Sequence, residues 1–217
     1  DEGTYDPKVS LFLDGDQLPG ADAGDWMHCN SITYNAILDQ IVLSSRHRSE
    51  LYVIDHSTAT EEASLHSGGN FGIGGDFLYR WGNPQNYGRG DANDQILKGQ
   101  HSVVWIPEDF PGYGNFILFN NFHTINNSAV LEIVPPVNQD GSYFIDSINA
   151  YGPVNYDWVY ELGHMAAVRG GVWRLPNGNT IITTFNELFE INDNSDIEWV
   201  YNGSLSPSRV IKYELDY

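Results

Sequence analysis

The feature that most constrains this chain is a loose repeat of short, β-prone runs separated by turn residues. The first set of runs lies at residues 30–34, 40–45, 50–55 and 77–81, and apolar and aromatic side chains dominate them. Runs of this kind, bounded by Gly, Pro, Asn or Ser, are typical of strands joined in a meander. Helical periodicity is almost absent along the chain. We therefore expect an all-β protein.

The same pattern recurs twice more. A second set of runs covers 101–106, 114–120, 129–134 and 156–161, and a third covers 171–175, 180–184, 187–191 and 196–201. Each set ends in an aromatic strand that contains a tryptophan: Trp81, Trp158 or Trp199. A repeat of four short strands is the signature of propeller blades. The sequence therefore predicts a β-propeller built from four-stranded antiparallel blades.

We expect one propeller fragment over residues 1–217. Its expected parts are an irregular lead-in at 1–24, blades at 25–84, 100–162 and 165–203, and a closing strand at 204–217. About three blades do not close a ring, because complete propellers carry roughly four to eight. An open ring leaves sheet edges and one blade face uncovered. We therefore expect missing N-terminal blades, a partner chain or a second copy in a homo-oligomer to cover it.

Charge and composition exclude several classes of protein. The chain has 29 acidic and 10 basic residues, a formal net charge of −19, which repels nucleic acid phosphates. We interpret the acidity as a solubility feature, with calcium binding by surface carboxylates as the alternative. No apolar stretch is long enough to span a membrane. The sequence has no HxH or HExxH pair and no P-loop, so it predicts neither a metal site nor a cofactor.

Four residues are candidates for chemistry. His28 and Asn30 are two positions apart, so on a strand they would point to the same side, into the channel that the first strand of a blade lines. Arg46 suits bidentate binding of a tetrahedral oxyanion. His101 opens the second unit, in the position equivalent to His28, and a neutral imidazole can act as a covalent nucleophile. Each also has a structural reading: His28, Asn30 and His101 could satisfy backbone groups, and Arg46 could offset acids near a turn.

Several segments, taken in order, resemble the bacterial arylsulfotransferase family. They are DWMHCNSITYN, DQIVLSSRHRSELYVIDHST, FLYRWGNP, KGQHSVVWIP and GNFILFNN, and later LPNGNTII and SPSRVIKYELDY. The resemblance covers about residues 25–217 and implies the C-terminal half of a six-bladed propeller, with its site in the central channel. It implies transfer of a sulfuryl group from a phenolic sulfate ester to a phenol without the nucleotide sulfate donor PAPS. It also implies a periplasmic or extracellular location.

The same resemblance implies roles for the four candidates. His101 matches the nucleophile of a ping-pong reaction that passes through a sulfated histidine. His28 and Asn30 match a His-x-Asn pair, and Arg46 matches an arginine expected on the next strand of that blade. Protonated His28, Asn30 and Arg46 would then hold the sulfate oxygens, and one histidine would protonate the leaving phenolate.

The chain also departs from the family pattern. The resemblance implies a further histidine and a strand-rich domain N-terminal to this region, and we expect both to be missing from residues 1–217. Ser102 follows His101 where related sequences often have an acid. A non-catalytic propeller that binds a ligand or protein is therefore the alternative function. A third hypothesis is a hydrolase that passes the sulfuryl group to water.

Overall fold

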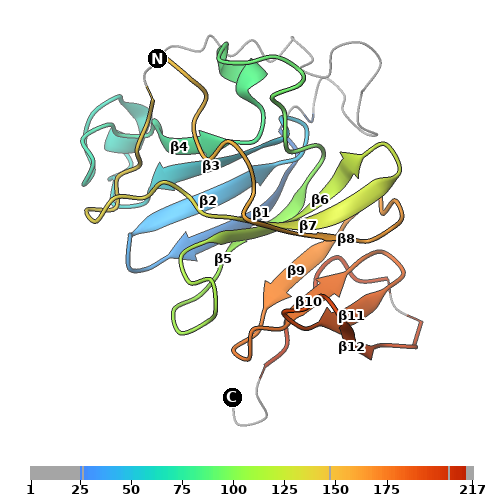
Figure 1. Ribbon diagram of the computed structural model, residues 1–217. Coiled ribbons are helices and arrows are strands. Elements are labelled where there is room, and N and C mark those ends of the chain that lie inside the picture. Colours follow the sequence, from blue (N-terminus) through green and yellow to red (C-terminus); the bar gives the residue numbers. More distant parts are fainter. Residues whose placement is uncertain (1–24, 26, 147, 205, 214–217) are drawn as a thin grey trace.

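The computed structural model describes residues 25, 27–146, 148–204 and 206–213. Its strands form three four-stranded antiparallel sheets, each a meander of consecutive strands (Figure 1). The described part contains two short 3-10 helices, η1 (Glu62–Ser64) and η2 (Pro84–Tyr87), and no α-helix. None of its helices is long and apolar enough to cross a membrane. The expected all-β class is confirmed, while the expected lead-in at 1–24 lies outside the described residues.

The strands lie where the repeated runs predict them. The first sheet contains β1 (Cys29–Asn35), β2 (Gln40–Ser45), β3 (Glu50–Asp55) and β4 (Phe77–Trp81). The second contains β5 (His101–Trp105), β6 (Phe116–Thr124), β7 (Asn127–Ile133) and β8 (Trp158–Glu161). The third contains β9 (Gly171–Arg174), β10 (Thr180–Thr183), β11 (Leu188–Ile191) and β12 (Ile197–Val200). The largest difference is at β6, which continues to Thr124 because it pairs with β7 beyond the apolar run.

The second sheet is buried on both of its faces. On β6, Phe116 and Leu118 pack into a core shared with the first sheet, while Ile117 and Phe119 pack into a core shared with the third. Successive strand residues point to opposite faces, so a strand covered on both sides must be apolar at every position. Each such side chain stabilises the fold by roughly 1.5–3 kcal/mol. The continuous apolar runs of the second unit thus reflect its central place.

The first strands of the three sheets meet in the middle of the molecule. Each of them, β1, β5 and β9, lies at one edge of its own sheet. β1 packs against β5, and β5 packs against β9 (Figure 1). The residues that begin these strands are therefore brought together, although they lie far apart in the sequence.

The long loop after β7 fastens the second sheet to the first. Gln40 Nε2 donates to the carbonyl of Gly141 at 2.8 Å, and the Tyr143 hydroxyl donates to Gln40 Oε1 at 2.9 Å. Further along the loop, the carbonyl of Pro153 accepts a 2.7 Å hydrogen bond from Trp81 Nε1. The loop therefore acts as a clamp on the first sheet.

The expected closing strand at 204–217 is not found, since residues 204 and 206–213, its described part, contain no strand. This segment crosses a face of the third sheet. Val210 packs beside Ile181 and Leu188, and Lys212 Nζ pairs with Glu190 Oε2 at 2.9 Å. A strand needs a free sheet edge for its backbone N–H and C=O groups. A sheet face offers only side-chain contacts, so the segment stays irregular.

Candidate functional site

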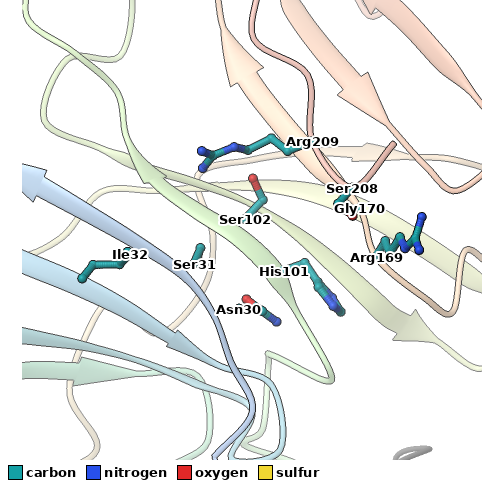
Figure 2. A pocket seen from close by; sticks show the side chains of 9 residues that line it. All are labelled: Asn30, Ser31, Ile32, His101, Ser102, Arg169, Gly170, Ser208 and Arg209. Atoms are coloured by element: carbon teal, nitrogen blue, oxygen red, sulfur yellow. The ribbon is translucent and has the colours of Figure 1, made fainter. Parts of the chain in front are cut away.

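A pocket of about 440 Å³ lies where β1, β5 and β9 begin. These three strands, which meet in the middle of the molecule, are called the inner strands below. Figure 2 shows the side chains that line it: Asn30, Ser31, Ile32, His101, Ser102, Arg169, Gly170, Ser208 and Arg209. They come from the start of all three sheets and from the C-terminal segment. The charged side chains in this lining are both arginines. The pocket therefore favours an anionic ligand.

His101 reaches the pocket because the start of β5 is irregular. The register of β5 against β6 shifts between His101 and Val104, and Ser102 has a φ of 57°. A left-handed backbone conformation at a residue other than glycine costs on the order of 1–3 kcal/mol, and such conformations cluster at functional sites. A bulge of this kind re-aims the neighbouring side chain.

Hydrogen bonds fix the proton of His101 on one ring nitrogen. Its Nδ1 lies 2.7 Å from Asn121 Oδ1 and 3.2 Å from the carbonyl oxygen of Gly99. Both partners are acceptors, so Nδ1 carries the proton and Nε2 carries the lone pair. The buried Asn121 amide is oriented by its own donation to the carbonyls of Ala166 and Arg169, at 2.8 and 2.5 Å. Its oxygen therefore has to face the histidine.

Burial keeps the His101 ring neutral. Desolvation lowers the pKa of His101 to about 4, and the positive charge of Arg46 acts in the same direction, while the bond to Asn121 opposes it. At neutral pH the ring is therefore an uncharged imidazole with its Nε2 lone pair available, the state in which histidine is a nucleophile.

Arg46 lies in a turn rather than on the expected strand. β2 ends at Ser45, and the chain reverses through residues 46–49, closed by a 3.2 Å bond from the backbone N–H of Ser49 to the carbonyl of Arg46. The Arg46 backbone N–H donates to the carbonyl of His28 at 3.2 Å, which places this turn against the start of β1. The side chain is buried, and burial lowers the pKa of Arg46. Arg46 is not among the residues that line the pocket, and its positive charge contributes to the lowered pKa of His101.

His28 also departs from the sequence expectation. It precedes β1 with a φ of 48°, and the register of β1 against β2 shifts between Cys29 and Ser31. The alternation that would put His28 and Asn30 on one side requires regular extended backbone, so it does not apply here. Asn30 lines the pocket, whereas the His28 ring packs 4.7 Å from the ring of His47.

Asn30 joins the first sheet to the second. Its Nδ2 donates to the carbonyl of Gln100 at 2.7 Å, directly before His101. The other Nδ2 proton can bind an anion. The Asn30 Oδ1 atom is buried and has no hydrogen-bond partner among the described residues. Such an acceptor is costly to leave unsatisfied, so it favours a ligand that brings a hydroxyl.

Asp25, His28 and His47 form a cluster that the sequence does not predict. Their ligand-type atoms all lie within 4.8 Å of one another, close enough to hold a metal ion. The Asp25 carboxylate pairs with His28 Nδ1, and this hydrogen bond lowers the pKa of Asp25. His47 Nδ1 lies 2.5 Å from the Asp25 carbonyl oxygen. The residues meet because the β2–β3 turn folds back on the chain before β1, so no local spacing motif could reveal them.

Three other residues escaped the sequence analysis as site candidates. Asn121 lies in β6, one residue beyond the run expected at 114–120, and nothing in the sequence indicated its contact with His101. Arg169 lies two residues before β9, and His28 lies one residue before β1, so the similar placement was the available signal. Arg209 lies in the C-terminal segment, whose path over the third sheet only the structure gives.

Comparison with known proteins identifies the family. The sequence profile described as arylsulfotransferase (ASST) matches residues 11–149. This range contains His28, Asn30, Arg46 and His101, whereas residues 150–217, where the resemblance was also expected, lie outside it. No curated protein matches the chain significantly.

Two solved structures are similar to this one. A protein of unknown function from Bacteroides caccae is 16% identical with a TM-score of 0.42, and the match covers 82% of this chain and 46% of that one. Kuenenia stuttgartiensis hydrazine synthase is 9% identical with a TM-score of 0.43, and the match covers 84% of this chain and 40% of that one. The chain thus spans less than half the length of either. Because the family profile covers more than half of the chain, the chain belongs to the arylsulfotransferase family.

Proposed function

We propose that this protein transfers a sulfuryl group from a phenolic sulfate ester to a phenol through a sulfated His101. The observation that carries the proposal is the state of His101 in a member of this family. Its ring is neutral at physiological pH, its Nδ1 proton is bound to Asn121, and its Nε2 is left for a ligand of a cationic pocket.

In the first half-reaction, His101 Nε2 attacks the sulfur atom while the bond from sulfur to the aryl oxygen breaks. The new N–S bond gives the ring a positive charge. The Asn121 Oδ1 and the Gly99 carbonyl, which accept from Nδ1–H, stabilise that charge as it develops. Because both acceptors are already in place, little reorganisation accompanies the step.

The negatively charged groups of the reaction are the sulfate oxygens and the leaving phenolate, and they interact with Arg46, Asn30 and His28. The guanidinium of Arg46 and the second amide proton of Asn30 hold sulfate oxygens. His28, protonated at Nε2, gives its proton to the leaving phenolate, while Asp25 holds the opposite ring nitrogen. In the second half-reaction the acceptor phenol oxygen attacks sulfur, the N–S bond breaks, and the phenol proton goes to His28. His101 returns neutral, so atoms and charges balance.

We also propose that the three sheets are blades of a propeller with β1, β5 and β9 nearest its axis. The contacts between these strands support that arrangement. Exposed apolar side chains support the view that more structure covers the outer sheets. Ile32 and Tyr34 of β1, and Ile197 and Trp199 of β12, are each 46–64% exposed. Further blades, another chain or a second copy would bury them.

The test is intact mass of the protein after a brief pulse of 4-nitrophenyl sulfate, with nitrophenolate release followed by absorbance. We expect a gain of one sulfuryl group that maps to His101 and disappears when phenol is added. An adduct that discharges equally fast without phenol would indicate a hydrolase. Ligand binding with neither adduct nor nitrophenolate would indicate a non-catalytic binding module.

A further inference from the structure

We propose that Arg209 forms a subsite for a second anionic group, a carboxylate or further sulfate, on the aromatic ring of the donor or acceptor. This inference deepens the proposed function and rests on it for the reaction at His101. Arg209 lies outside the residues that the family profile matches, and the resemblance of its segment, SPSRVIKYELDY, to the family implies no role for it.

The segment that carries Arg209 is fixed on both sides. Before it, Arg169 Nη1 donates to the carbonyl oxygen and hydroxyl of Ser206, at 2.7 and 3.2 Å. The Arg169 guanidinium also lies 5.0 Å from the centre of the Phe185 ring. After it, Lys212 pairs with Glu190. Arg209 is therefore held between two anchored points.

Gly171 lets this segment approach the start of β9. A Cβ atom at Gly171 would lie 2.9 Å from the Cα of Arg209, closer than a side chain tolerates. The backbone of Arg209 therefore rests directly on the third inner strand, at the rim of the pocket. From there its side chain extends over the pocket on the side of Ser102 (Figure 2).

The charge of Arg209 is available to a ligand. No ion pair or hydrogen bond to its guanidinium occurs among the described residues, whereas Arg169, the other charge of the lining, is bound to Ser206. In a chain with 29 acidic and 10 basic residues, an arginine at a pocket without an acidic partner is unusual. Such a cation favours an anionic group of a ligand.

Ser102 supplies a second polar group at this end of the pocket. Its hydroxyl oxygen accepts a 3.4 Å hydrogen bond from the backbone N–H of Val172 and keeps its own proton to donate. Figure 2 shows this hydroxyl pointing to the Arg209 side, while the His101 ring extends to the opposite side with Asn30. A sulfate ester at His101 would thus place its ring between the two ends. A pocket of about 440 Å³ suits a small aromatic molecule of this kind.

The experiment is calorimetric binding of 4-hydroxyphenylacetate and its neutral amide, 4-hydroxyphenylacetamide, to the intact protein. The two phenols are alike in size and need no sulfuryl transfer to bind. We expect the carboxylate to bind about fivefold more tightly than the amide, with the preference falling as salt rises. Arg209→Gln should abolish the preference, and Arg209→Lys should retain part of it. Arg89→Gln, which removes a positive charge outside the pocket lining and outside the segment that carries Arg209, should retain it.

A wild-type protein without the preference, or an Arg209→Gln variant that keeps it, overturns the subsite. The adduct on His101 is measured separately with 4-nitrophenyl sulfate, so the Arg209 subsite and sulfuryl transfer at His101 can be overturned independently. A preference lost in Arg209→Gln without any adduct in the wild type supports the subsite and overturns the transferase. An adduct on His101 with an unaltered preference in Arg209→Gln supports the transferase and overturns the subsite.

Discussion

His28 and His101 stand at comparable places, at the beginning of the inner strands of neighbouring sheets, and each lies beside a shift in strand register. Their surroundings differ. His101 binds an amide oxygen, and burial lowers its pKa to about 4. The side chain of His28 is 42% exposed and binds the Asp25 carboxylate. One residue type in two environments can thus serve two roles, because a neutral partner suits a nucleophile and an anionic partner suits a proton donor.

The difference arises from where the two strands lie. β5 belongs to the sheet that is covered on both faces, so the side chain of its first residue, His101, is largely removed from solvent. β1 belongs to an outer sheet, and the exposed side chains Ile32 and Tyr34 show that one of its faces is open. The position of each sheet in the molecule therefore decides which histidine side chain is desolvated.

Removing each histidine in turn should give the largest contrast. We expect His101→Ala to lower sulfuryl transfer about 10³-fold or more and to leave no protein adduct, since the attacking atom is gone. We expect His28→Ala to lower transfer about 10²-fold but still to form the adduct, since only proton donation is lost. Nitrophenolate release and intact mass measure both.

His66→Ala is the matched control, because His66 is an exposed histidine paired with Asp76 on a loop after β3. It should leave the rate unchanged. An adduct in His101→Ala, or its absence in His28→Ala with the fold intact by circular dichroism, would contradict the assignment of roles.

Weakening the carboxylate partner should have a smaller effect that depends on the substrate. We expect Asp25→Asn to slow transfer about tenfold for esters of weakly acidic phenols, whose leaving oxygen needs a proton. It should hardly affect 4-nitrophenyl sulfate, whose leaving group is stable as an anion. The measurement is the dependence of rate on phenol pKa in wild type and variant. Equal slowing for all leaving groups, with Asp76→Asn as control, would show that Asp25 only supports the fold.

The low pKa of His101 should also appear in the pH dependence of stability. Its folded pKa of about 4 lies below the ordinary histidine value of about 6.5, so the unfolded chain binds more protons between these values. Stability from this group is then fully present above about pH 6.5 and is lost as pH falls toward 4. The loss is on the order of 3 kcal/mol. Urea unfolding of wild type and His101→Gln at pH 7.5 and 4.5 should show it as a larger decrease in the wild type. Equal decreases would mean that His101 is not desolvated.

Most of the fold could be predicted from local pattern, because strand propensity and turn residues are local properties. Every run expected in the three blades contains a strand. His101 and Arg46 were selected as candidates for the chemistry of their side chains, and their roles stay predictions. The path of residues 206–213 could not be predicted, because it depends on contacts with a sheet face rather than on its own sequence.

The partners of the site residues were hidden for the same reason. Asn121 is separated from His101 by a hairpin, and its role follows from the register of β6 against β5. The placement of His28 was misjudged because a positive φ, which interrupts strand alternation, leaves no mark in the sequence when the residue is not glycine. Spacing rules predict which side chains share a side only where the backbone is regular.

The smallest expected effect is that of metal removal, and it bears directly on the role of His28. Asp25, His28 and His47 could bind a metal ion by their proximity. The Asp25 carboxylate, however, already binds the proton on His28 Nδ1, which a metal at that nitrogen would displace. We therefore expect incubation with EDTA, followed by its removal, to leave the transfer rate and the thermal unfolding midpoint unchanged. If EDTA abolished activity and zinc restored it, His28 would be a ligand rather than a proton donor. The contrast with His101 would then lie between a metal-bound and a metal-free histidine, and the Asp25→Asn variant should lose zinc as well as rate.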